Sequence, residues 1–219
     1  GFIASGGDGY NAALYVPLRT ETETLTTMTT VKYQLAEKVS LFIEAQFANI
    51  DAVDSRNPSS FDSSMMIDRA NPFLPIDVAA LMDLNGLSEL RVQRTHEDHG
   101  LETNDLTKKT FSFIGGFEGQ IFDEWNWNAF FQYGPYDYNS QMKNSRINSH
   151  FSEAIDVISD PVTGDPICRS ATARDEGCEP LNVIGRDVAS EAALDYILHT
   201  RLRDITNSQK VIGVQFDGS

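Results

Sequence analysis

The chain has few cysteines, few basic residues and no long apolar run. Two of its 219 residues are cysteine. It has 17 lysines and arginines against 32 aspartates and glutamates, which gives a formal net charge of -15. A surface of that sign repels a phosphate backbone, so we expect no nucleic-acid partner. No apolar stretch approaches the roughly 20 residues of a membrane helix. The first residues also lack the basic and then apolar pattern of a signal peptide.

Motifs for catalysis and for resident cofactors are missing as well. We find no nucleophile elbow and no HExxH helix, and the glycines at residues 6–9 are too few for a nucleotide fingerprint. Glu44 and Glu118 could form a pair of carboxylates, but both alternate with apolar neighbours, as on the hydrated face of a strand. The sequence therefore predicts no catalytic residue, no cofactor and no enzyme.

The two cysteines, Cys168 and Cys178, lie close together in a stretch rich in proline, glycine and aspartate. This spacing predicts a disulfide that clamps an exposed loop, which requires an oxidising compartment such as the periplasm or the cell surface. Zinc is the alternative, but no histidine or third cysteine is near enough in the sequence to complete a tetrahedral site.

The most informative stretch is a predicted hairpin over residues 111–133. Phenylalanines and an isoleucine fall on one face of its first strand, and polar residues lie mostly on the other. After a polar turn at residues 123–124 the alternation resumes. The register that keeps apolar residues opposite one another pairs Ile121 with Trp127, Gly119 with Ala129 and Phe117 with Phe131.

A second hairpin is predicted over residues 22–50, with Tyr33 opposite Ile43 and Val31 opposite Ala45. Residues 200–216 predict a further strand and 88–100 a weaker one. The long connections 53–86 and 141–199 carry three predicted short helices, at 76–85, 145–158 and 190–198. About six strands follow from this pattern, so the fold class is all-β and antiparallel.

Long strands with two distinct faces are typical of outer-membrane β-barrels. Trp125 and Trp127 flank a short turn, so we predict that they anchor one membrane interface, although stacking on a sugar is an alternative role. Tyr133, Tyr136 and Tyr138 come near the other end of the same strand. Short turns on one side and long loops on the other are also typical of these barrels, and long loops tend to be functional.

Three segments resemble the barrel region of TonB-dependent outer-membrane receptors of the proteobacterial type. They are NPFLP at residues 71–75, FEGQIFDEWNWNAFFQYG at 117–134 and DPVTGDPICRSATARDEGCEPLNVIG at 160–185. The resemblance implies part of a large barrel in the bacterial outer membrane that imports a scarce nutrient. Siderophores, cobalamin and oligosaccharides are the ligands of that family, and the TonB system supplies the energy through a plug domain.

The whole chain, residues 1–219, is predicted to be one segment of such a barrel. About six strands are too few to close it, since bacterial barrels start at eight strands. We identify no plug domain and no closing strand in the sequence, so contact with the TonB system would involve the missing plug. The alternative is a soluble or secreted β-rich binding module, such as an adhesin, whose apolar faces pack on one another.

Other candidate binding residues give weak signals. His96, Glu97, Asp98 and His99 could suggest a metal cluster, but residues three apart on a strand point to opposite faces, so convergence would need a turn. We interpret them as a solvated loop edge and predict no metal site. His150 and His199 are isolated. Scattered carboxylates that could suggest calcium lack EF-hand spacing: Asp51, Asp54, Asp62, Asp156 and Asp160.

Overall fold

The computed structural model describes residues 18–58, 61–122 and 124–218, and the side chains of all of these except residues 56–58 and 61. The glycines at residues 6–9 lie outside this range. The elements in chain order are β1 (Glu21–Ala36), β2 (Val39–Pro58), β3 (Phe61–Asp68), α1 (Ile76–Leu84), β4 (Glu89–Thr95), the 3-10 helix η2 (Glu97–His99), β5 (Leu101–Ile121), β6 (Trp125–Arg146), α2 (Asn148–Ile155), β7 (Val157–Ser159), β8 (Pro166–Cys168), α3 (Ala171–Asp175), α4 (Glu191–Ile197) and β9 (Leu198–Gly218).

The chain divides into two compact units that alternate along the sequence. Unit 1 contains residues 55–103 and 142–201 together with Leu18, and unit 2 contains residues 19–54, 104–141 and 202–219, within the described ranges. The long connections of the sequence therefore fold into a unit of their own, and the hairpins make up most of the other.

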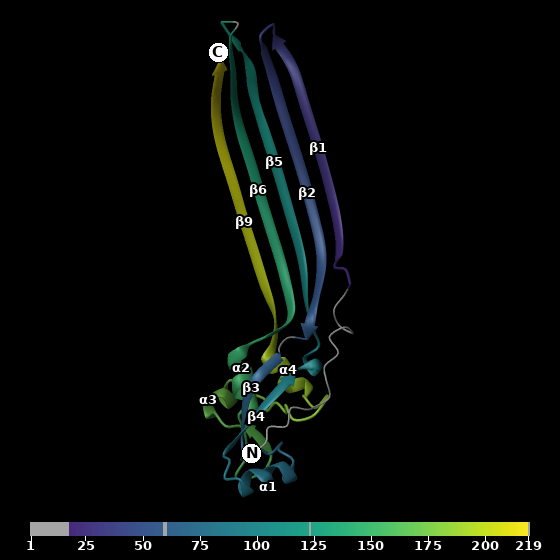
Figure 1. The fold of residues 1–219 in the computed structure, drawn as a ribbon, viewed down its shortest axis with the longest axis vertical. Helices are drawn as coiled ribbons and strands as arrows, with labels where there is room; N and C mark the ends of the chain where they lie inside the picture. Colours follow the sequence, from purple (N-terminus) through teal and green to yellow (C-terminus); the bar gives the residue numbers. More distant parts are fainter. Residues whose placement is uncertain (1–17, 59–60, 123, 219) are drawn as a thin grey trace. The chain divides into compact units, whose positions relative to one another are not determined.

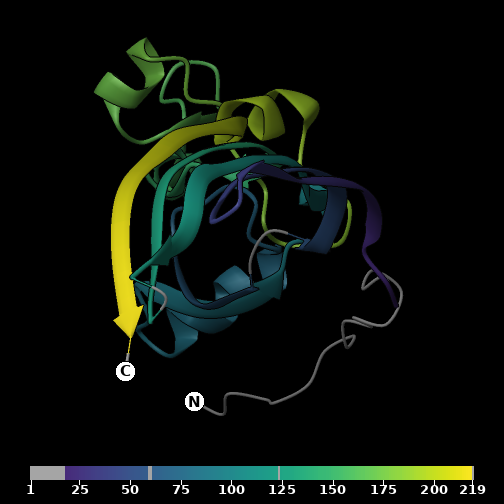
Figure 2. The same cartoon turned by 90° about the horizontal axis from the view of Figure 1, so that it is seen from above.

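Unit 2 is built on one five-stranded sheet in the order β1-β2-β5-β6-β9 (Figure 1). Seen from above, its strands form a single curved layer (Figure 2). The structure is mostly antiparallel β-sheet, which confirms the predicted all-β class. Among the described strands, β1 and β9 each have one neighbour in this sheet.

The predicted pairing of β1 with β2 is wrong by two residues. Tyr33 lies opposite Leu41 and Val31 opposite Ile43, where Ile43 and Ala45 were expected. The turn is tighter than predicted, because β1 continues to Ala36 and β2 starts at Val39. A shift of two residues keeps every side chain on its face, so the apolar pattern alone does not distinguish the two registers.

The second hairpin is longer than the predicted 111–133, since β5 starts at Leu101 and β6 continues to Arg146. A Cβ on Gly119 would lie 2.9 Å from the indole nitrogen of Trp127, so a larger residue at this position would collide with that indole. The pairing of Ile121 with Trp127 stays a prediction.

In its described residues, unit 1 combines short strands with the α-helices α1 to α4 and the 3-10 helix η2. Helices α1 and α4 confirm the predictions at 76–85 and 190–198, and the side chain of Ser190 caps α4 by accepting a hydrogen bond from the backbone N–H of Ala193. The helix predicted at 145–158 is shorter, since α2 covers Asn148–Ile155 and its N-cap is Ile147. The sequence missed β3, α3 and the β7–β8 pair, because α3, β7 and β8 have three to five residues and β3 depends on pairing with β4.

The apolar core lies in unit 1. Every apolar side chain that is buried among the described residues belongs to this unit, and Ile67, Leu181 and Ile197 are fully covered. In the described part of unit 2, the buried side chains are those of Ser40, Asn104 and Ser140. Across the described ranges, no helix has the length and apolar character needed to cross a membrane.

Candidate functional site

A stacked pair of buried histidines is the most unusual polar feature of unit 1. β4 ends at Thr95, and the next residues form η2, in which the backbone N–H of His99 donates to the carbonyl of His96. Side chains three residues apart are eclipsed in a 3-10 helix. The two imidazole rings therefore stack, with centroids 4.4 Å apart and 15° between their planes.

The predicted solvated loop edge at this position is wrong. His96 and His99 are 0% and 1% exposed. The strand spacing that argued against convergence does not apply here, because η2 supplies the necessary turn and Gly100 ends it with a φ of 72°. Phe151 of α2 contacts both imidazoles edge-on and closes the apolar side of the pair.

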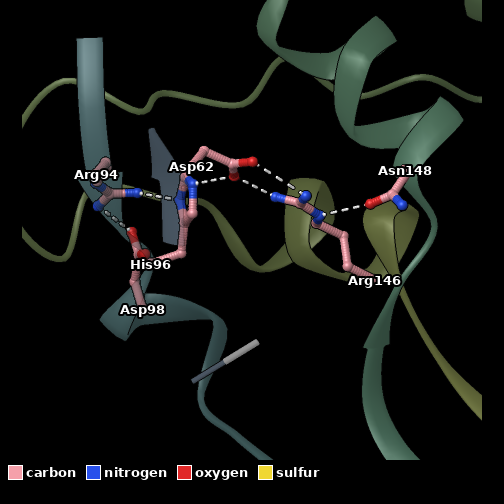
Figure 3. A network of polar contacts seen from close by, with 6 residues as sticks. All are labelled: Asp62, Arg94, His96, Asp98, Arg146 and Asn148. Atoms are coloured by element: carbon pink, nitrogen blue, oxygen red, sulfur yellow. Dashed lines mark hydrogen bonds and ion pairs between the residues drawn. The ribbon is translucent and has the colours of Figure 1, made fainter. Parts of the chain in front are cut away.

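His96 is held from both sides of its ring (Figure 3). Its Nδ1 lies 3.0 Å from a guanidinium nitrogen of Arg94, and its Nε2 lies 2.9 Å from a carboxylate oxygen of Asp62. Arginine only donates hydrogen bonds, so Nδ1 accepts and Nε2 carries the proton that is donated to Asp62. Asp62 and Arg94 face each other across the β3–β4 ladder, which places both beside the ring.

Two guanidiniums balance the two carboxylates of this cluster (Figure 3). Arg146, at the end of β6, donates to Asp62 and lies with its guanidinium 4.0 Å from the centroid of the Phe151 ring. Arg94 donates to Asp98 over 2.8 Å and to the carbonyl of Gly185 over 3.0 Å. Taken together, these four charged groups carry no net charge.

Burial keeps both histidines neutral. It lowers the pKa of His96 to about 4 and that of His99 to about 3, and the nearby positive charges act in the same direction. Burial also opposes ionisation of Asp62 and Asp98, but their hydrogen bonds with Arg146 and Arg94 hold the pKa of each below its ordinary value. At neutral pH the cluster thus contains two neutral imidazoles and two carboxylates.

His99 differs from His96 in having no hydrogen-bond partner. Neither of its ring nitrogens contacts a donor or acceptor among the described residues, and the same holds for Oδ1 of Asp98. One ligand atom each from His96, Asp98 and His99 lies within 4.8 Å of the others. The cluster offers nitrogen and oxygen ligands, and it contains no serine, threonine or cysteine as a nucleophile.

A pocket of about 360 Å³ in unit 1 leads to this cluster. Asp98 and His99 line it together with Glu191 and Asp195 of α4. Its walls therefore carry three carboxylates beside the unpartnered imidazole.

Cys168 and Cys178 form the predicted disulfide. The stretch around them is mostly exposed, as predicted, but the two cysteine side chains are buried and belong to the core of unit 1. The bond encloses α3, and the backbone N–H of Cys178 donates to the carbonyl of Ala173 in that helix. No thiolate is left for the alternative zinc site.

The other candidate residues do not assemble into a site. Glu118 forms an ion pair with Lys32, and Glu44 is exposed opposite Thr30. His150 stacks on Tyr196, and His199 donates to the carbonyl of Ser145. Trp125 and Trp127 lie at the start of β6, where Trp125 is exposed and Trp127 is half-buried. Their role at a membrane interface stays a prediction.

The acidic residues considered for calcium are also scattered. Asp51 accepts from Thr107, Asp156 pairs with Arg169, and Asp160 accepts from the backbone of its own turn. Asp62 is the exception, since it belongs to the histidine cluster. Arg94 and Arg146 were missed because they lie 32 and 84 residues from Asp62, and nothing in the local sequence marks them.

No protein-family model, curated protein or solved structure matches this chain.

Proposed function

We propose that the sheet of unit 2 spans a bacterial outer membrane as part of a β-barrel, and that the chain belongs to a TonB-dependent receptor for nutrient uptake. One observation carries the proposal. Large apolar side chains of unit 2 are exposed, including Phe117 at 46% and Phe131 at 40%, while no apolar side chain in its described part is buried. A water-soluble sheet buries such a face, whereas a barrel turns it to lipid.

Most of the exposed apolar side chains of β1 share one face of the sheet, and Met28 lies on the other. Val31 and Tyr33 of β1 lie opposite Ile43 and Leu41 of β2, so all four point to the same side. The other side of these strands carries Thr24, Thr26, Thr30 and Lys32 on β1, and Lys32 pairs with Glu118 of β5. An alternation of this kind separates a lipid face from a hydrated interior.

On β2 and β5 the apolar face is richest in the half of the strand next to the hairpin turn, although Val53 of β2 is exposed beyond it. On β5 it extends from Phe111 to Ile121 and stops at the exposed Lys109. On β2 the same face changes at Asn49 and Asp51. Eleven residues lie between Phe111 and Ile121 inclusive, which agrees with the roughly 9–11 residues of a tilted membrane strand.

On β6, tyrosines lie on both faces of the strand at the end of the apolar segment that is away from the hairpin turn. By strand alternation Tyr133 shares the face of Trp125 and Trp127, whereas Tyr136 and Tyr138 fall on the other. Lys108 lies over the ring of Tyr138, and Lys210 over that of Tyr133. The interface anchors of β6 would therefore be the two tryptophans at one end and Tyr133 at the other.

The polar face offers a place for a nutrient to pass. A pocket of about 530 Å³ in unit 2 is lined mainly by polar side chains, among them Gln34, Glu118, Asn126, Asn128 and Gln215. Together with the three segments that resemble TonB-dependent receptors, a hydrated interior supports uptake of a polar nutrient. Siderophores, cobalamin and oligosaccharides all fit that class.

Spin labels at neighbouring residues of β6 test the orientation of the sheet. Single cysteines replace Phe131 and Gln132, and each is labelled with a nitroxide after the chain is inserted into phospholipid vesicles; the native disulfide leaves no other free thiol. We expect the label at 131 to be relaxed by oxygen, which partitions into lipid, and the label at 132 by a water-soluble nickel chelate. Equal access of the nickel chelate to both labels would refute the membrane sheet and favour the soluble β-rich module.

A further inference from the structure

The unpartnered ring of His99 calls for an explanation. Buried polar groups in proteins nearly always have a hydrogen-bond partner, because leaving one unsatisfied costs about 1–3 kcal/mol. Here both nitrogens of a ring that is 1% exposed lack a partner among the described residues, as does Oδ1 of Asp98 one residue earlier. Asp98 and His99 both line one pocket, and one ligand atom from each lies within 4.8 Å of the other and of one from His96.

We propose that His96, Asp98 and His99 bind a divalent transition-metal ion such as Zn²⁺. The ligands are a ring nitrogen of His99, Oδ1 of Asp98 and Nδ1 of His96. Two imidazoles and one carboxylate suit zinc and its first-row neighbours, whereas calcium and magnesium take oxygen ligands. The site is independent of the proposed uptake function, because all of its residues lie in unit 1.

The surroundings of His96 already match those of a metal ligand. Metal-bound histidines usually donate their second N–H to a carboxylate, which fixes the tautomer and the direction of the ring. His96 donates its Nε2 proton to Asp62, and Arg146 holds that carboxylate in turn. The nitrogen that remains, Nδ1, is the one directed toward Arg94.

Arg94 is the group that a metal ion must displace. Its guanidinium contacts Nδ1 of His96 and Oδ2 of Asp98, so one positive charge already bridges two of the three ligands. Arg94 also donates to Gly185, and Oδ1 of Asp98 has no hydrogen-bond partner in the part of the chain that the structure describes. Arg94 can therefore keep its hydrogen bonds to Asp98 and Gly185 and lose only the one to His96 when the ion binds.

The pocket provides the route of entry. Glu191 and Asp195 line it together with Asp98 and His99, so a cation meets carboxylates before it reaches the imidazoles. Arg94 and Arg146 oppose a cation, but Asp62 and Asp98 balance their charge. The ion thus enters a cluster whose own charges cancel.

Zinc titration of the folded full chain in detergent tests the site. The chain has four histidines, so the ring-nitrogen NMR signals of each can be followed as zinc chloride is added. We expect the signals of His96 and His99 to shift with one zinc ion per chain, and those of His150 to stay in place. No shift at His96 and His99 up to about millimolar zinc would overturn the proposal.

A matched pair of variants tests the same site by calorimetry. His99→Phe keeps an aromatic ring on the stack but removes both nitrogens, and His150→Phe makes the same change at a histidine that stacks on Tyr196. We expect zinc affinity to fall roughly tenfold or more in the first variant and to stay within about twofold in the second. Unchanged affinity in a folded His99→Phe chain would also overturn the site, and the wild-type NMR titration decides if that variant fails to fold.

Discussion

His96 and His99 are residues of the same type, three positions apart, with opposite surroundings. His96 has a partner at each ring nitrogen, and His99 has none among the described residues. Both rings are buried, and burial lowers the pKa of both, so both are neutral bases at pH 7. The difference at the residue scale is that the lone pair of His99 is available without breaking a bond, whereas that of His96 is shared with Arg94.

Asp62 is the residue on which the cluster depends, because it pairs with both His96 and Arg146. Replacing Asp62 by alanine leaves the Arg146 guanidinium, 13% exposed, without its carboxylate. We expect the free energy of unfolding to fall by about 2–3 kcal/mol, since losing one partner of a buried pair strands the other charge. Urea denaturation of unit 1, followed by near-UV circular dichroism, measures the change.

The control is Asp83→Ala, which removes the carboxylate of an exposed ion pair with Arg69 in the same unit. Exposed pairs contribute little to stability, so the urea midpoint should stay close to that of wild type. Equal effects of the two substitutions would contradict the central role of Asp62.

At the scale of elements, the sequence predicts what depends on local periodicity. Alternation in β1, β2, β5 and β6 predicted long two-faced strands, and the helix predicted at 190–198 is α4. The register of β1 against β2 was missed by two residues, because turn geometry decides between registers that share a face. Alternation sets the face of a residue, and the turn sets its partner.

The candidate site was harder to predict than the fold for the same reason. The sequence marks His96, Asp98 and His99 as a group, but strand spacing argued that the two rings diverge. One turn of 3-10 helix reverses that argument, and three residues are too few to give a periodic signal. Asp62 and Arg146 join the cluster from elsewhere in the chain, so only the tertiary structure shows them.

The Cys168–Cys178 disulfide holds a short helical element in place. It joins residues ten positions apart around α3 and lies in the core of unit 1. Reduction should lower the free energy of unfolding by about 2–3 kcal/mol, the loop entropy of a closure of that length. Guanidinium denaturation with and without a thiol reductant measures the difference, and the Cys168→Ser/Cys178→Ser variant should no longer respond to the reductant. An unchanged midpoint on reduction would show that packing alone orders this loop.

At the scale of the whole molecule, the two units of the chain differ in whether they bury apolar side chains. Unit 1 buries an apolar core around Ile67, Leu181 and Ile197, as a protein folded in water does, although Ile76, Leu81 and Leu84 of α1 stay exposed. Unit 2 exposes Leu25, Val31 and Phe216 and, in its described part, buries only polar side chains. Lipid around the sheet and water around unit 1 would accommodate both units, and so would a partner surface on the sheet.

A lysine placed on either face of the sheet separates lipid from water as the surroundings of unit 2. Phe117→Lys puts a charge on the apolar face, and Gln46→Lys puts the same charge on the polar face, at an exposed residue opposite Met28. If lipid covers the apolar face, Phe117→Lys should destabilise the folded state in phospholipid vesicles by about 2–4 kcal/mol, the cost of a lysine near the bilayer midplane. Gln46→Lys should change this stability little, because the polar face stays hydrated.

Equilibrium urea titration in vesicles, followed by the fluorescence of Trp125 and Trp127, measures both variants. Equal tolerance of the two lysines would mean that the apolar face meets water or protein, and unit 2 would then need a partner surface in place of a membrane.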